Sequence, residues 1–168
     1  LQRARLRILT IIPLTLILIF LLLYQSLKSL KQSMLVLSCI PMAISGGILL
    51  LWLRDIPFSV SASVGMIALS GIAILNGTVL VNFFNDLRRD GHSLMDAVFR
   101  GTLIRLRPVL MTGLVAGLGF IPMAFNTGTG AEVQRPLATV VVGGLITATL
   151  LTLLVVPTLY YRLEKNHE

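Results

Sequence analysis

The chain has 168 residues, of which 55% are apolar and 12% are charged, and its formal net charge is +7. A water-soluble domain carries about 25% charged residues, so this composition excludes water as the solvent of most of the surface. A positive charge can indicate nucleic-acid binding, but here the basic residues lie between long apolar stretches, where charge ordinarily sets membrane topology. We therefore expect membrane lipid around the chain and no nucleic-acid partner.

Five uncharged stretches are long enough to cross a membrane. They cover residues 8–27, 32–53, 58–85, 108–127 and 136–161. A helix of about 20 apolar residues crosses a hydrocarbon core of about 30 Å, and a charge at its centre costs roughly 2.5–3.5 kcal/mol on insertion scales. We predict an all-α fold, a polytopic transmembrane helix bundle with five spans. Small residues spaced by four, Gly113 with Gly117 and Ala73 with Gly77, predict close packing between its helices.

The long connection between the third and fourth stretches predicts a sixth, shorter element. Ser93 is suited to cap a helix with Asp96 three residues further on, and apolar residues then recur near helical spacing over 94–103. This pattern is typical of an amphipathic helix that lies in the membrane interface. The sequence therefore predicts a short interfacial helix over residues 94–104.

Basic residues are distributed unevenly between the two sides of such a bundle. Nine of the 14 Lys and Arg residues fall on the side that holds the carboxy terminus, and five fall on the other side. The positive-inside rule then places the carboxy terminus in the cytoplasm and the Leu1 end outside. Because the chain begins at Leu1 rather than Met and has an odd number of predicted spans, we expect a piece of a longer protein.

Polar residues within the third and fourth stretches are the candidate functional residues. Asn76 and Asn82 lie in the third stretch, where an unpaired amide is costly, so we expect each to hydrogen-bond to another helix or to face a polar path. Arg105 and Thr112 are two turns apart on one helical face, where a cation and a hydroxyl can line one crevice. Arg105 is also placed to extend to the cytoplasmic interface.

Other reactive residue types form no recognisable site in the sequence. Cys39 has no second cysteine, the six methionines are dispersed and suit ordinary packing, and His92 and His167 lie in a loop and a tail without a second ligand nearby. No nucleophile constellation or phosphate loop is present, so we expect no enzyme activity, no bound metal and no cofactor. The five stretches contain no Asp, Glu, Lys or His, so this chain cannot supply a complete proton relay.

Three runs of sequence resemble the resistance-nodulation-division (RND) transporters, most closely the heavy-metal efflux branch of cobalt-zinc-cadmium type. They are residues 71–77 (GIAILNG), 105–112 (RLRPVLMT) and 127–141 (TGTGAEVQRPLATVV). The resemblance covers essentially the whole chain and implies spans eight to twelve of a proton-driven pump in the bacterial inner membrane. It further implies an amino-terminal half outside this chain, a homotrimer, a periplasmic adaptor and an outer-membrane channel.

The resemblance also implies site residues and a substrate class. Asn76, Thr112 and Arg105 match positions that the family places near its proton path. Leu75 stands where multidrug members have lysine and copper-silver members have glutamate, and Val109 stands where copper-silver members have lysine. These departures favour zinc, cobalt, cadmium or nickel as the substrate. Multidrug-type efflux of organic compounds and a non-transporting membrane scaffold or translocation accessory remain alternatives.

Overall fold

The computed structural model describes residues 2–166 and, for residues 2–9 and 12, the backbone alone. The described chain forms five α-helices: α1 (Gln2–Leu27), α2 (Leu30–Leu53), α3 (Val60–Arg89), α4 (Leu94–Ala124) and α5 (Ala131–Lys165). The predicted all-α fold is confirmed. Of the described helices, α2 to α5 are long and apolar enough to cross a membrane, and α1 contributes a shorter apolar stretch, Pro13–Leu27.

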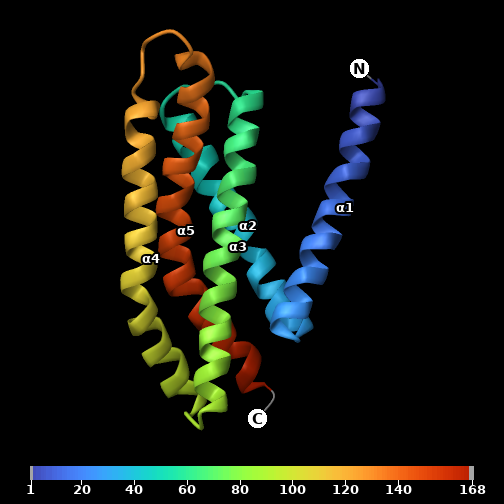
Figure 1. Ribbon diagram of the computed structural model, residues 1–168, viewed down its shortest axis with the longest axis vertical. Coiled ribbons are helices and arrows are strands. Elements are labelled where there is room, and N and C mark those ends of the chain that lie inside the picture. The colour runs from blue at the N-terminus through green and yellow to red at the C-terminus, as the bar shows by residue number, and fades with distance from the viewer. Residues whose placement is uncertain (1, 167–168) are drawn as a thin grey trace.

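Helix α5 lies at the centre of the bundle and packs against α2, α3 and α4 (Figure 1). Helix α1 leans away from these four and contacts α2 and α3 near its carboxy-terminal end, where Leu23 and Leu27 are buried (Figure 1). On the outside of the bundle, Leu114, Val115 and Leu118 of α4 are largely exposed. An outer surface of such side chains suits hydrocarbon rather than water.

The interfacial helix predicted over residues 94–104 is not a separate element, because these residues form the first turns of the continuous helix α4. Ser93 caps the helix as predicted, since its hydroxyl accepts a hydrogen bond from the Asp96 amide at 3.3 Å. The inner face of this segment packs on α3, where a Cβ added at Gly101 would lie 2.6 Å from the Phe84 ring. This contact keeps the segment in line with α3. With 31 residues, α4 is about 46 Å long and extends beyond a hydrocarbon core.

The two small-residue pairs differ in what they contact. Ala73 and Gly77 of α3 are buried, and a Cβ added at Gly77 would lie 3.4 Å from an α2 side chain. Gly113 of α4 faces Thr149 of α5, where an added Cβ would lie 2.6 Å from the hydroxyl oxygen. Gly117, in contrast, has no such neighbour within 4 Å and lines an open groove between α4 and α5. The packing prediction is therefore wrong at Gly117.

Glycines on both sides of the α2–α5 contact bring these helices together. A Cβ added at Gly143 would lie 2.8 Å from the Gly46 carbonyl oxygen and 2.5 Å from the Leu50 Cβ atom. Neither atom is the movable end of a side chain, so a larger residue at Gly143 forces the two helix backbones apart.

We expect Gly143→Ala to lower the free energy of unfolding by about 1–3 kcal/mol, the usual cost of overpacking. Thermal unfolding of the purified protein in detergent, followed by circular dichroism, measures the effect. Gly119→Ala is the matched control, because this helical glycine has no such neighbour within 4 Å of an added Cβ. Equal losses of stability in the two variants would contradict the packing argument.

Candidate functional site

A cleft of about 220 Å³ between α3 and α4 brings the three predicted site residues together. Asn76 enters it from α3, and Arg105 and Thr112 enter it from α4. The complete lining is Leu75, Asn76, Val79, Leu80, Arg105, Pro108, Val109 and Thr112.

Helical spacing explains which side chains line the cleft. On α4, Arg105, Val109 and Thr112 follow one another at intervals of four and three residues, which places them on one face. On α3, Asn76 and Leu80 are four residues apart and share a face in the same way. The cleft forms where these two faces meet.

Arg105 is the charged residue of the cleft. Its guanidinium lies over the Phe83 ring, with Cζ 4.6 Å from the ring centroid, a cation–π contact worth about 0.5–2 kcal/mol. The Nε atom is buried and has no hydrogen-bond acceptor among the described side chains. A buried charged donor without an acceptor is costly, so this guanidinium is suited to bind a further acceptor, either an acidic group or water.

Asn76 and Thr112 add neutral hydrogen-bonding groups. The Thr112 hydroxyl donates to the Pro108 carbonyl at 2.9 Å, and its oxygen retains capacity to accept a hydrogen bond. The Asn76 amide is half-buried and has no hydrogen-bond partner within the part of the chain that the structure describes. An interhelical hydrogen bond of Asn76 is therefore not formed within these residues, and its amide is left for the cleft.

Asn82 forms a hydrogen bond to another helix, which is one of the two roles that the sequence predicts for it. Its side-chain nitrogen donates to the Ser26 hydroxyl of α1 at 3.4 Å. This bond links α3 to α1, which otherwise leans away from the bundle (Figure 1).

A second polar cluster, which the sequence analysis missed, joins α2, α3 and α5. Gln32 donates to the Asn85 side-chain oxygen at 3.1 Å and to the Glu164 carboxylate at 2.9 Å. Asn85 donates back to Gln32 at 2.8 Å, and Tyr160 donates to Asn85 at 2.7 Å. Gln32 and Asn85 lie at the margins of uncharged stretches, which is the signal that could have identified them. Because its members satisfy one another, the cluster holds the three helices in register.

The other reactive residues have local contacts. His92 Nδ1 lies 2.9 Å from the Asp96 carboxylate, and Arg100 Nε donates to the same carboxylate at 2.8 Å. His167 lies outside the described residues. Among the residues described, no group of three or more His, Cys, Asp or Glu side chains is arranged to hold a metal ion.

Comparison with known proteins identifies the family of this bundle. Residues 1–164 match the model of the AcrB/AcrD/AcrF family. The chain belongs to the AcrB/AcrD/AcrF family.

Relatives of this family member include heavy-metal resistance proteins. It is 55% identical over 168 residues to the cobalt-zinc-cadmium resistance protein CzcA of Cupriavidus metallidurans, an alignment that covers 100% of this chain and 16% of the relative. It is 57% identical over 157 residues to the nickel-cobalt-cadmium resistance protein NccA of Alcaligenes xylosoxydans xylosoxydans, which covers 94% of this chain and 15% of the relative. The chain thus spans about a sixth of the length of these relatives.

A solved structure has the same arrangement of helices. The crystal structure of a heavy metal efflux pump matches with a TM-score of 0.84 and 48% sequence identity, over 98% of this chain and 16% of that chain. The resemblance to the RND heavy-metal efflux branch is confirmed. These relatives are named as resistance and efflux proteins.

In this AcrB/AcrD/AcrF family member, the two positions from which the sequence analysis inferred the substrate class, Leu75 and Val109, also belong to the cleft. Leu75 and Val109 both line it, the first exposed and the second buried. The cleft lining therefore holds one cation, Arg105, and no Asp, Glu, Lys or His.

Proposed function

We propose that this chain forms spans eight to twelve of a proton-driven pump that exports heavy-metal cations across the bacterial inner membrane by antiport. The observation that carries the proposal is the convergence of Arg105, Asn76 and Thr112 in one cleft of an apolar helix bundle. The names of the relatives, which refer to cobalt, zinc, cadmium and nickel, support the substrate class.

In this proposal the cleft is one wall of the proton path. Arg105 supplies a positive charge, while Asn76 and Thr112 bind water or a polar side chain. A relay also needs a group that titrates, and the cleft lining contains none. We assign that acid to the part of the pump outside this chain. Its carboxylate pairs with Arg105 when ionised and releases it when protonated, so proton uptake changes how the helices are held together.

Helix α1 is the fifth span of the proposal. Its 26 residues extend about 39 Å, enough to cross a hydrocarbon core, and Leu14, Ile17 and Leu18 present an exposed apolar surface. The first turns of α4 occupy the interface, where Met95 and Phe99 are exposed. The distribution of basic residues supports a cytoplasmic carboxy terminus and a periplasmic Leu1 end.

The remaining parts of the pump lie outside this chain, which matches only 16% of the length of CzcA. We propose that they comprise an amino-terminal membrane half and external domains, that the pump is a homotrimer, and that it works with a periplasmic adaptor and an outer-membrane channel.

We expect the full-length protein to confer resistance to zinc, cobalt, cadmium or nickel and little resistance to silver. Soft monovalent copper and silver favour thioether and thiolate ligands, whereas the divalent ions accept imidazole and carboxylate. The methionines of this chain are dispersed, and Leu75 and Val109 are apolar. Growth of a pump-deleted host that carries the full-length gene, on graded zinc and on graded silver, measures the two resistances.

The same host carrying an empty vector is the control for this experiment. Higher tolerance to zinc with unchanged tolerance to silver supports the assignment. Protection against silver alone would overturn it and return the dispersed methionines to consideration as ligands.

A further inference from the structure

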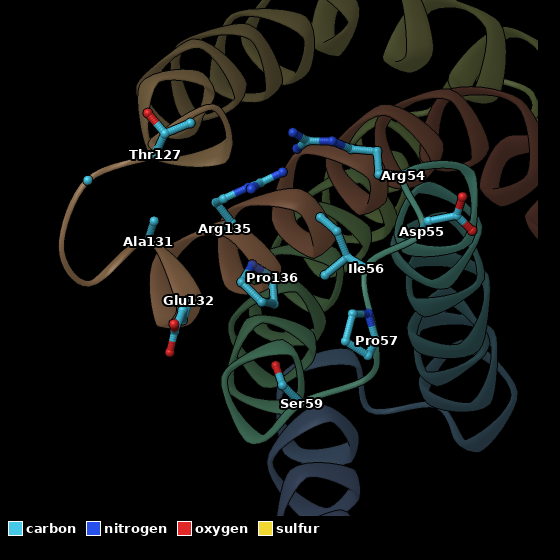
Figure 2. Close-up of a pocket in the computed structure, with 11 residues that line it drawn as sticks. Arg54, Asp55, Ile56, Pro57, Ser59, Thr127, Ala131, Glu132, Arg135 and Pro136 are labelled. Atoms are coloured by element: carbon cyan, nitrogen blue, oxygen red, sulfur yellow. The ribbon is translucent and has the colours of Figure 1, made fainter.

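A second cavity, of about 540 Å³, lies at the end of the bundle where α2 and α4 end and α3 and α5 begin (Figure 2). Its walls come from the α2–α3 connection and from the α4–α5 connection with the first turns of α5. It is separate from the cleft between α3 and α4, and no residue lines both.

Two arginines enter this cavity from different elements. Figure 2 shows Arg54, at the end of α2, and Arg135, in the first turns of α5, extending toward one another, while Asp55 and Glu132 point away from them. Among the described residues, neither arginine forms a salt bridge with a carboxylate. Two like charges that face one cavity repel each other, and an anion between them removes that repulsion.

The two arginines differ in how firmly they are held. Arg54 donates to the Thr139 hydroxyl at 2.8 Å and to the Ala124 carbonyl at 2.9 Å, and its Cζ atom lies 4.8 Å from the centroid of the Phe125 ring. Arg135 has a buried Nε atom without a hydrogen-bond partner among the described side chains. The side chain of Arg54 is therefore held in place by its own contacts. Arg135 retains an N–H donor that is not yet hydrogen-bonded and can bind an anion.

The backbone adds positive potential to the same place. Helix α5 begins after Gly130 without a side-chain cap. Helix α3 begins after Ser59, which lines the cavity and whose hydroxyl accepts a hydrogen bond from the Ala62 amide at 3.3 Å. Helix amino termini carry a partial positive charge because the peptide dipoles of the helix are aligned. The partial charges at the amino termini of α3 and α5 therefore add to the positive potential that the two guanidinium groups create in the cavity, and this potential favours an anion.

The position of the cavity relative to the membrane indicates which anion it binds. Arg54 directly follows the apolar helix α2, so the cavity lies at the level of lipid headgroups when the bundle spans a membrane. Trp52, Phe58 and Phe125, at the same end of the helices, are 74%, 66% and 69% exposed. Exposed aromatic side chains at span ends are typical of the membrane–water interface. Guanidinium groups match phosphate oxygens with paired hydrogen bonds.

We propose that this cavity binds the phosphate group of an anionic phospholipid from the adjacent leaflet, held between Arg54 and Arg135. The lipid then ties the α2–α3 connection to the start of α5 on the side of the membrane where these helices meet. The proposal concerns lipid binding and stands independently of the proposed proton path.

Native mass spectrometry of the full-length protein in mild detergent tests this site, with short-chain phosphatidylglycerol, short-chain phosphatidylcholine and inorganic phosphate titrated separately. We expect phosphatidylglycerol to bind most tightly. Arg135→Gln should weaken phosphatidylglycerol binding roughly tenfold through the loss of charge-assisted hydrogen bonds. Arg135→Lys keeps the charge but loses the paired donors, so it should fold and bind with intermediate affinity.

Arg162→Gln is the matched control, because Arg162 is an exposed arginine of α5, the helix that also carries Arg135, and lies near its carboxy-terminal end. It should change the affinity by less than about twofold, since it removes the same charge outside the cavity. Equal phosphatidylglycerol affinity in the wild type and both Arg135 variants would overturn the proposal. Arg135-dependent binding of inorganic phosphate without any binding of phosphatidylglycerol would overturn it as well, in favour of a site for the free ion.

Discussion

Arg105→Gln in the full-length protein is expected to abolish metal resistance while leaving the protein folded and in the membrane. Glutamine cannot replace the guanidinium that faces the cleft beside Asn76 and Thr112. The loss of an interaction with a charged group costs about 1.5–3 kcal/mol, so we expect zinc efflux to fall by roughly tenfold or more. Growth on graded zinc and pH-driven zinc transport in proteoliposomes measure the two effects.

Arg107→Gln is the control for this experiment, because Arg107 is an exposed arginine of the same helix that does not line the cleft. It should retain wild-type resistance. Asn76→Leu combined with Thr112→Val should lower resistance at unchanged protein abundance, since both variants remove hydrogen-bonding groups from the cleft. Full resistance in this double variant would mean that protons take another route.

Arg54→Leu is expected to lower the free energy of unfolding by about 3 kcal/mol, from the loss of two charged hydrogen bonds and one cation–π contact. The variant leaves the buried Thr139 hydroxyl and the Ala124 carbonyl without this donor and removes the contact with the Phe125 ring. These contacts tie the end of α2 to α4 and α5. Thermal unfolding in detergent without added phospholipid measures this loss separately from any lipid effect.

The matched control is Arg162→Leu, which makes the same substitution at an exposed position of α5. It should leave the unfolding temperature close to that of the wild type. If Arg54→Leu unfolds at the same temperature as this control, the contacts of Arg54 do not hold the helix ends together.

The sequence by itself determined where the helices lie. Uncharged stretches and caps such as Ser93 act over a few neighbouring residues, because a helix forms its hydrogen bonds within one segment. The same local patterns placed Arg105 and Thr112 on one helical face. They could not show whether residues 94–104 turn away as an interfacial helix, because that depends on the contact between Gly101 and Phe84 of α3.

Only the tertiary structure decided which polar groups meet. Asn76 lies beside Arg105, Gln32 beside Glu164, and Arg54 faces the same cavity as Arg135, although the members of each pair belong to different helices. In lipid no hydrophobic driving force selects the inward face of an apolar helix, so helix rotation follows from packing at small residues such as Gly143 and from interhelical hydrogen bonds. Those contacts join residues far apart in the chain, and no local pattern of the sequence contains them.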